Sequence, residues 1–136
     1  MLLASKPAKL KKSEFAPLYL KAHAAGLEAA KKVVPVPMIV AQHASVLDDS
    51  SPVVKSWYVP SGVCGFAWVS VKPGNSGFAK WLVANGYASK DSYAGGVCLW
   101  VSLFGQSLEL KESYAYAFAR VLQEAGIKAY GNSRMD

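Results

Sequence analysis

The chain has 136 residues, of which 52% are hydrophobic and 18% charged, and its formal net charge is +6. A chain of this size and composition can bury one core, so the sequence indicates a single domain and excludes wholesale disorder. The longest apolar run, Val33–Ala41, contains two prolines and is too short to span a membrane. Two cysteines are too few for a disulfide scaffold, so we expect a cytoplasmic protein with no membrane partner.

Positive charge is concentrated in the first quarter of the chain. Residues 1–32 hold seven lysines and two glutamates, whereas residues 33–136 hold eight basic and seven acidic side chains. The sequence predicts a flexible basic arm over 1–12 and a single domain over 13–136. An uneven distribution of positive charge favours an anionic partner. A lysine-rich tail can, however, also act only to increase solubility. The candidate phosphate-binding residues of the arm are Lys6, Lys9, Lys11 and Lys12.

The first half of the domain is expected to hold one helix and two extended segments. Apolar residues spaced by three and four predict a helix over 14–32. Two prolines then exclude helix, so residues 36–41 are expected to be extended, and the polar stretch 42–52 is expected to be a loop. Residues 53–59 read as a strand that pairs with 63–71 across a short turn.

The second half alternates strands and helices. The strands predicted over 63–71 and 96–103 are apolar on both faces, so we expect them to be central and covered on both sides, with Trp68 and Trp100 in the core. Helices are predicted over 77–85 and 110–125, each ended by a glycine, before a last short strand over 127–130. The expected fold is α+β, a mixed β-sheet with a C-terminal βαβαβ portion and an N-terminal helix.

A short motif recurs after each predicted strand of this second half. Gly-Asn-Ser or Gly-Gln-Ser follows the strand three times, at 74–76, 105–107 and 131–133. If these strands pair in parallel, the three loops lie together at one rim of the sheet, beside two helix N-termini that favour phosphate. The alternative is ordinary turn and helix-capping chemistry. The residues predicted to bind phosphate or nucleic acid here are Lys72, Gly74, Asn75, Ser76, Gly105, Gln106, Ser107, Asn132, Ser133 and Arg134.

Catalytic and metal-binding signatures are missing from the sequence. The only histidines, His23 and His43, and the only cysteines, Cys64 and Cys98, match no catalytic triad and no zinc spacing. We therefore predict no catalytic residue, no metal and no cofactor, and we expect a protein that is not an enzyme. Aromatic residues that could stack on bases, or simply pack at sheet edges, are Trp57, Tyr58, Tyr87, Tyr93 and Tyr130.

Several pieces of the chain after Gly62 together resemble small uncharacterised proteins of tailed bacteriophages. They are Gly65-Phe66-Ala67-Trp68-Val69, Gly95-Gly96-Val97, Gly105-Gln106-Ser107, Ala117-Phe118-Ala119, Gly126-Ile127-Lys128-Ala129-Tyr130 and the closing Ser133-Arg134-Met135-Asp136. The resemblance covers Gly62–Asp136 at most, and the basic arm lies outside it. It implies a phage or phage-derived origin and a place inside a bacterial host, and it implies no activity.

These observations favour a non-enzymatic binding protein for nucleic acid or a phosphate-bearing ligand. The alternative is a phage factor that binds or inhibits a host protein, in which case the lysine-rich arm would contact an acidic surface of that protein. A small hydrolase or transferase is disfavoured, because the predicted rim offers no general base.

Overall fold

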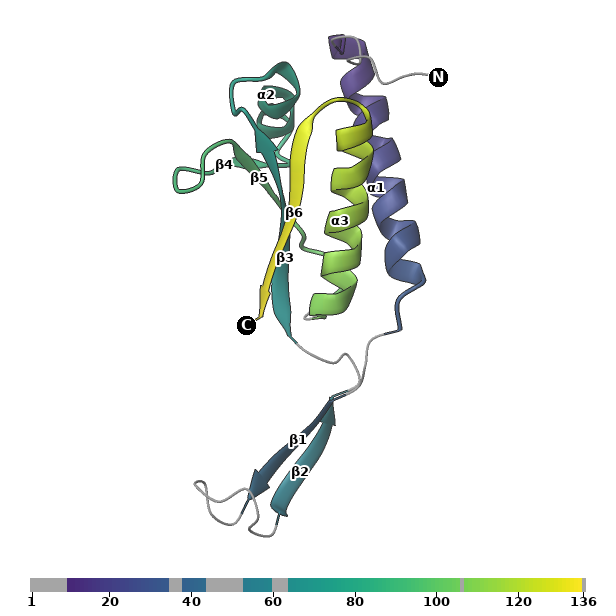
Figure 1. The fold of residues 1–136 in the computed structure, drawn as a ribbon, viewed down its shortest axis with the longest axis vertical. Coiled ribbons are helices and arrows are strands. Elements are labelled where there is room, and N and C mark those ends of the chain that lie inside the picture. Colours follow the sequence, from purple (N-terminus) through teal and green to yellow (C-terminus); the bar gives the residue numbers. More distant parts are fainter. Residues whose placement is uncertain (1–9, 35–37, 44–52, 60–63, 106, 136) are drawn as a thin grey trace.

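The computed structural model describes residues 10–34, 38–43, 53–59, 64–105 and 107–135. A 3-10 turn over Lys12–Glu14 leads into helix α1 (Phe15–Lys31), and strands β1 (Met38–His43) and β2 (Val53–Val59) follow. Then come β3 (Gly65–Lys72), α2 (Gly77–Ala84), β4 (Ser89–Lys90), β5 (Val97–Trp100), α3 (Leu108–Glu124) and β6 (Lys128–Met135). The α+β class is therefore confirmed, and the three predicted helices are present with small shifts at their ends (Figure 1).

The strands form two separate sheets. β1 and β2 make an antiparallel hairpin of their own, whereas the main sheet has the order β4-β5-β3-β6. The predicted pairing of 53–59 with 63–71 is thus wrong, because β2 pairs with β1 and both edges of β3 are taken by β5 and β6. In Figure 1 the hairpin extends away from one end of the main body.

The main sheet is antiparallel at every pairing that the structure describes, which corrects the predicted mixed sheet. Helix length explains the difference. Helix α2 has 8 residues and spans about 12 Å, whereas β3 spans about 26 Å, so α2 cannot return the chain to the start of β3. The chain turns at Gly86 and the next strands start where β3 ended. Helix α3, with 17 residues, does span the sheet, and it joins β5 to β6 with β3 between them.

Both predicted serine caps are present. The Ser76 hydroxyl accepts a hydrogen bond from the Ala79 N–H at 3.3 Å, and the Ser107 hydroxyl accepts one from the Leu110 N–H at 3.4 Å. Gly86 and Gly126 follow the ends of α2 and α3 with positive φ, as predicted. These local signals fixed the helix ends, because capping depends on the residues next to each terminus.

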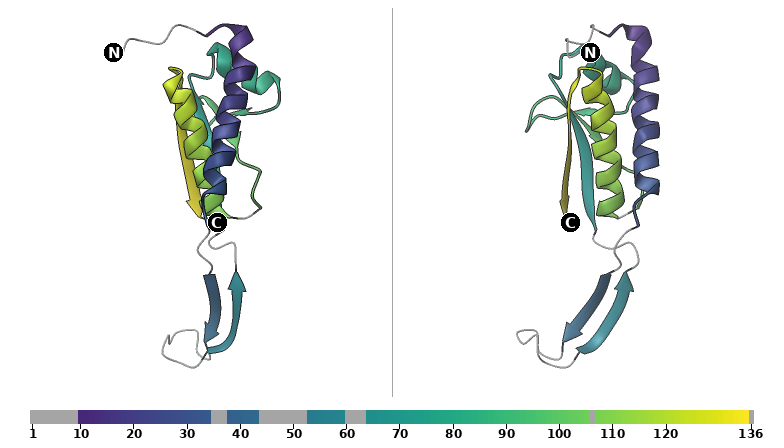
Figure 2. Two further views of the ribbon diagram at one scale, coloured as in Figure 1. Left: turned by 90° about the vertical axis from the view of Figure 1, so that its right-hand side faces the viewer. Right: turned by 45° about the vertical axis from the view of Figure 1, so that its right-hand side comes forward.

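The helices cover one face of the sheet only. Helix α3 packs on β3 and β6, and α1 packs on α3 (Figures 1 and 2). The side chains of Ala67, Val69 and Val71 point into this interface and are completely buried. Gly26 lets the two helices approach closely, since a Cβ there would lie 2.5 Å from the Tyr114 ring. Of the helices in the described residues, none is both long and apolar enough to cross a membrane.

The expectation that both faces of the central strands are covered is therefore wrong. β3 is central as predicted, and β5 lies between β3 and the two-residue β4. Yet Trp100 is 46% exposed, and Trp68 is only partly buried. One apolar face packs against the helices, and the other is a hydrophobic surface patch. Sequence alone does not distinguish such a patch from a face covered by a second core layer.

We expect Phe118→Ala to lower the free energy of unfolding by about 3–5 kcal/mol, because Phe118 is completely buried on α3. Trp100→Ala should cost only about 1–2 kcal/mol, because half of this side chain already faces water. Urea denaturation followed by circular dichroism measures both values. Equal losses would show that another layer covers the second face.

Candidate functional site

The uncovered face of the main sheet carries aromatic and polar side chains in register. On the central strand β3, Trp68 lies between Trp100 on β5 and Asn132 on β6. Ser70 lies between Cys98 and Tyr130 in the next row. Because side chains alternate along a strand, these residues share the face opposite the helices. We call this surface the open face, formed by Phe66, Trp68, Ser70, Lys72, Cys98, Trp100, Tyr130, Asn132 and Arg134.

Three aromatic rings form a continuous platform on the open face. The indoles of Trp68 and Trp100 are nearly parallel, with an interplanar angle of 6° and ring centroids 5.5 Å apart. The Phe66 ring lies 5.6 Å from the Trp100 ring. Tyr130, on the other side of β3, is 53% exposed. Flat rings that face water in this way offer stacking surfaces for other planar groups.

Positive charge flanks this platform at both ends. The Arg134 guanidinium lies 5.4 Å from the centre of the Phe66 ring, at the end where β3 begins. Lys72 and Lys128 are cross-strand neighbours at the other end. Between the ends lies an open depression of about 450 Å³, lined in part by Trp68, Trp100 and Arg134. Cations beside an aromatic surface suit a ligand that has both rings and negative charge.

Hydrogen bonds hold the polar groups of the open face. The Asn132 side-chain amide donates to the Ser70 hydroxyl at 3.0 Å and to the Tyr130 carbonyl at 3.2 Å. The Asp91 carboxylate, at the rim of the depression, accepts the backbone N–H groups of Tyr93 at 3.0 Å and Ala94 at 2.9 Å. Asp91 therefore shapes the β4–β5 turn, and its charge is partly satisfied within the turn.

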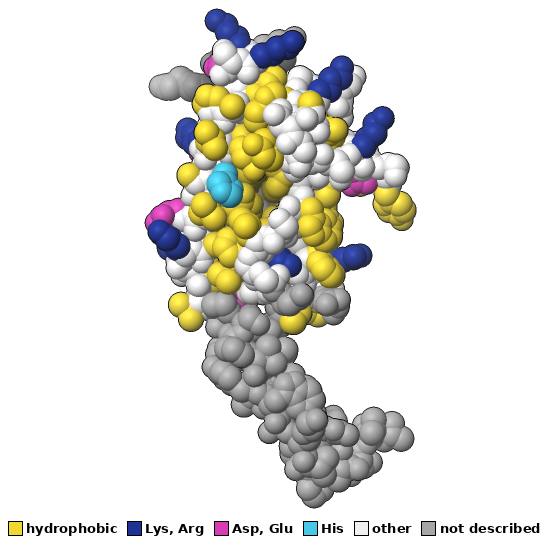
Figure 3. Space-filling view, turned by 180° about the vertical axis from the view of Figure 1, so that it is seen from behind, with side chains coloured by type: hydrophobic (Ala, Val, Ile, Leu, Met, Phe, Trp, Pro, Cys, Tyr) yellow, Lys and Arg dark blue, Asp and Glu magenta, His cyan; other side chains and the backbone are white. Residues whose placement is uncertain are grey.

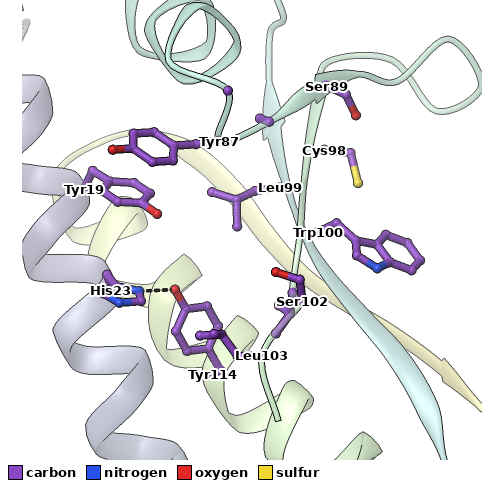
Figure 4. Close-up of a pocket in the computed structure, with 13 residues that line it drawn as sticks. Tyr19, His23, Tyr87, Ser89, Cys98, Leu99, Trp100, Ser102, Leu103 and Tyr114 are labelled. Carbon is purple, nitrogen blue, oxygen red and sulfur yellow. Dashed lines mark hydrogen bonds between the residues drawn. The ribbon is translucent and has the colours of Figure 1, made fainter. Parts of the chain in front are cut away.

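A second cavity lies on the helix side, between α1 and the free edge of β5. We call it the α1–β5 pocket; it has a volume of about 440 Å³, and Figure 4 shows its side chains. The Tyr19 and Tyr87 rings are stacked with centroids 4.1 Å apart. His23 Nδ1 and the Tyr114 hydroxyl are hydrogen bonded. Seen from behind, hydrophobic side chains gather along the middle of this side, with the histidine among them (Figure 3).

The pocket is lined by aromatic, apolar and hydroxyl-bearing side chains and by His23. Its described lining contains no Asp, Glu, Lys or Arg side chain. Burial raises the pKa of the Tyr114 phenol, and the neighbouring Tyr19 adds to the increase. Burial likewise raises the pKa of Tyr19, with a further contribution from Tyr87. Both phenols are therefore neutral hydrogen-bonding groups at physiological pH.

The predicted rim of three loops does not exist. Gly74–Ser76 follows the end of β3, whereas Ser107 pairs with Cys64 just before the start of β3, so these loops lie at opposite ends of the sheet. Residues 131–133 lie within β6, not in a loop. The rim required parallel strands, and the antiparallel sheet separates the three copies. Gln106 lies outside the described residues.

Some of the predicted binding residues do come together. Lys72, Asn132 and Arg134 share the open face. Ser133 points the other way, where its hydroxyl donates to the Glu112 carboxylate at 2.6 Å. In the arm, Lys11 and Lys12 are exposed next to the first turn of α1, whereas Lys6 and Lys9 lie outside the described residues.

The cysteines and histidines give no sign of a metal centre. Within the described part of the chain, no three His, Cys, Asp or Glu side chains are grouped as they would be around a metal ion. Cys64 and Cys98 are both free thiols. Burial, and secondarily the Asp91 charge, raises the pKa of Cys98, so this thiol stays protonated and is a poor nucleophile. His23 is half-buried in the α1–β5 pocket.

The aromatic platform was not found from the sequence. The sequence predicts Trp68 and Trp100 in the core, because nothing in their strands distinguishes a water-exposed apolar face from a buried one. One sequence pattern does indicate this face. In β6 the larger polar and aromatic residues Tyr130, Asn132 and Arg134 alternate with the small residues Gly131 and Ser133. Of the aromatic residues proposed for stacking, Tyr130 and Tyr93 do border the depression, whereas the side chains of Trp57 and Tyr58 lie outside the described part.

Comparison with known proteins does not identify a relative: a scan of protein-family models and searches of curated proteins and of solved structures found no match to this chain. The function must therefore be argued from the open face and the α1–β5 pocket themselves.

The raised pKa of Tyr114 predicts a loss of stability at alkaline pH. The stabilising effect of the neutral phenol is complete below its ordinary pKa of 10.0 and is lost as the pH rises from there toward the higher folded-state pKa. The free energy of unfolding should fall by at most about 1.4 kcal/mol per pH unit from this group. Urea denaturation between pH 8 and 11 measures the decline, and Tyr114→Phe should reduce its slope. Parallel declines in both proteins would refute the assignment.

Proposed function

We propose that the open face binds single-stranded nucleic acid. The observation that carries the proposal is the pair of parallel indoles of Trp68, partly buried, and Trp100, 46% exposed, on a sheet face that no described helix covers. Bases would stack on this platform, and Arg134 and Lys72 would contact phosphates at its two ends. Stacking on an aromatic side chain contributes about 1–3 kcal/mol per base, so two or three rings suffice for useful affinity.

A single strand fits this surface better than a duplex does. Aromatic rings can stack only on bases that are already unstacked from each other, as in single strands, loops and ends. The open face is also a gently hollowed sheet surface, whereas reading a duplex requires an element that enters a groove.

The charge of the open face favours an anionic ligand. Lys72 and Arg134 line the depression, and Lys128 lies next to Lys72 across the strands. Among the described residues of the lining, Asp91 is the one carboxylate. An acidic protein could use the same charges, which keeps the host-protein factor as the alternative. The stacked indoles favour nucleic acid, since their flat faces match bases and not carboxylate side chains.

The proposal includes the origin that the C-terminal resemblance implies, a phage-encoded protein that acts in the cytoplasm of its bacterial host. Stacking of bases on the open face does not depend on this origin, because it requires only the residues of that face.

Trp100→Leu should weaken binding of a labelled single-stranded oligonucleotide by about 1–3 kcal/mol, because one stacking ring is lost. The matched control is Tyr116→Leu, which removes an aromatic ring of similar exposure (48% against 46%) from α3. Fluorescence anisotropy with DNA and RNA oligonucleotides measures both. Unchanged affinity in Trp100→Leu, or equal losses in the two variants, would refute the proposal. No binding at low salt would favour the host-protein alternative.

The arm is expected to add sequence-independent affinity. Replacing Lys6, Lys9, Lys11 and Lys12 by Gln should make the slope of log affinity against log salt shallower by about 0.7 for each lost phosphate contact. The control replaces four exposed lysines elsewhere by Gln and so removes the same charge: Lys21, Lys31, Lys32 and Lys80. Equal slopes in the two quadruple variants would show that the arm contributes only net charge.

A further inference from the structure

The free edge of β5 supplies unpaired backbone groups to the α1–β5 pocket. Strand β4 is short and pairs only with Cys98 and Val97. Beyond these residues, the Val101 N–H donates to the Ala67 carbonyl at 3.0 Å, so Val101 faces β3. Because hydrogen-bonding direction alternates along an antiparallel strand, the N–H and C=O groups of Trp100, next to Val101, face away from β3, toward the pocket. Within the described chain no strand takes them up.

The side chains around this edge suit an uncharged ring. The stacked pair Tyr19–Tyr87 forms one wall, and Figure 4 shows the hydroxyl groups of Tyr19, Tyr114 and Ser102 around the hollow. The hydrogen bond between His23 Nδ1 and the Tyr114 hydroxyl orients both rings at this edge. A phosphate would find no Lys or Arg side chain in the described lining, whereas a heteroaromatic ring would find stacking surfaces and several hydrogen-bonding partners.

The pocket and the open face meet at β5. Cys98 and Trp100 line both the α1–β5 pocket and the depression on the open face. A single-stranded nucleic acid that lies on the open face and reaches this edge would therefore be close enough to place one base in the pocket. The pocket volume of about 440 Å³ lies in the range of small-molecule sites, which begins at roughly 300 Å³.

We propose that the α1–β5 pocket holds a single unstacked nucleobase and selects it by hydrogen bonds. The inference deepens the proposed function and rests on it: the open face binds the strand without preference, and the pocket supplies base selectivity. Hydrogen bonds from Ser102, Tyr19 and the backbone of Trp100 would meet the edge of the base, and selectivity arises because a mismatched base leaves such groups unpaired.

The test titrates the full chain with adenosine, guanosine, cytidine and uridine separately, and follows the backbone amide and histidine ring resonances by NMR. We expect saturable shifts at His23, Trp100 and Ser102 with at least one nucleoside. Tyr19→Phe keeps the ring and removes the hydroxyl. It should lower the affinity for the preferred nucleoside by about fivefold, the loss expected for one hydrogen bond. Tyr116→Leu, an exposed position on α3 that lines neither the pocket nor the depression, should leave nucleoside binding unchanged.

The outcomes separate this inference from the proposed function. If no nucleoside shifts these resonances while oligonucleotides still bind, the base pocket is refuted and the open face is retained. If shifts occur but are identical in Tyr19→Phe, and Trp68→Leu weakens them, the nucleosides bind the open face and the inference is again refuted. If nucleosides bind as expected but oligonucleotides do not, the proposed function fails and the pocket stands as a nucleoside site.

Discussion

One-sided burial of β3 is the constraint on which the rest of the structure depends. Its inward side chains, Ala67, Val69 and Val71, are completely buried against α3. Two helices stacked on the same side leave the other face without cover in the described chain. The strand must bury one face to fold, and the alternation of side chains then places every second residue on the face that the helices do not cover. The aromatic platform, its flanking cations and the free edge of β5 all follow from this arrangement.

Sequence patterns predicted the local structure well and the long-range structure poorly. The helices and their ends depend on neighbouring residues, such as Ser76 and Gly126, and these signals were sufficient. Strand direction depended instead on whether the short α2 could cross the sheet, which is a matter of length and not of composition. The repeated motif does supply helix caps, through Ser76 in the Gly-Asn-Ser copy and Ser107 in the Gly-Gln-Ser copy. This shared capping role does not bring the two loops together in space.

The candidate site was only partly visible in the sequence, for a physical reason. An apolar strand face can pack against a core or lie on the surface as a hydrophobic patch. Trp68 and Trp100 satisfy the same pattern in both cases, so only the three-dimensional arrangement separates the two. Lys72, Asn132 and Arg134 were identified through a loop argument that is wrong, yet strand register brings them to the same face.

The central claim is that single-stranded nucleic acid lies across the open face, and photo-crosslinking tests it most directly. An oligonucleotide carrying 5-iodouracil would be irradiated with the protein and the attachment sites mapped by mass spectrometry. The account predicts crosslinks in β3, β5 and β6, at Trp68, Trp100 or Tyr130. Crosslinks confined to residues 1–32 would contradict it and would assign binding to the lysine-rich first quarter alone.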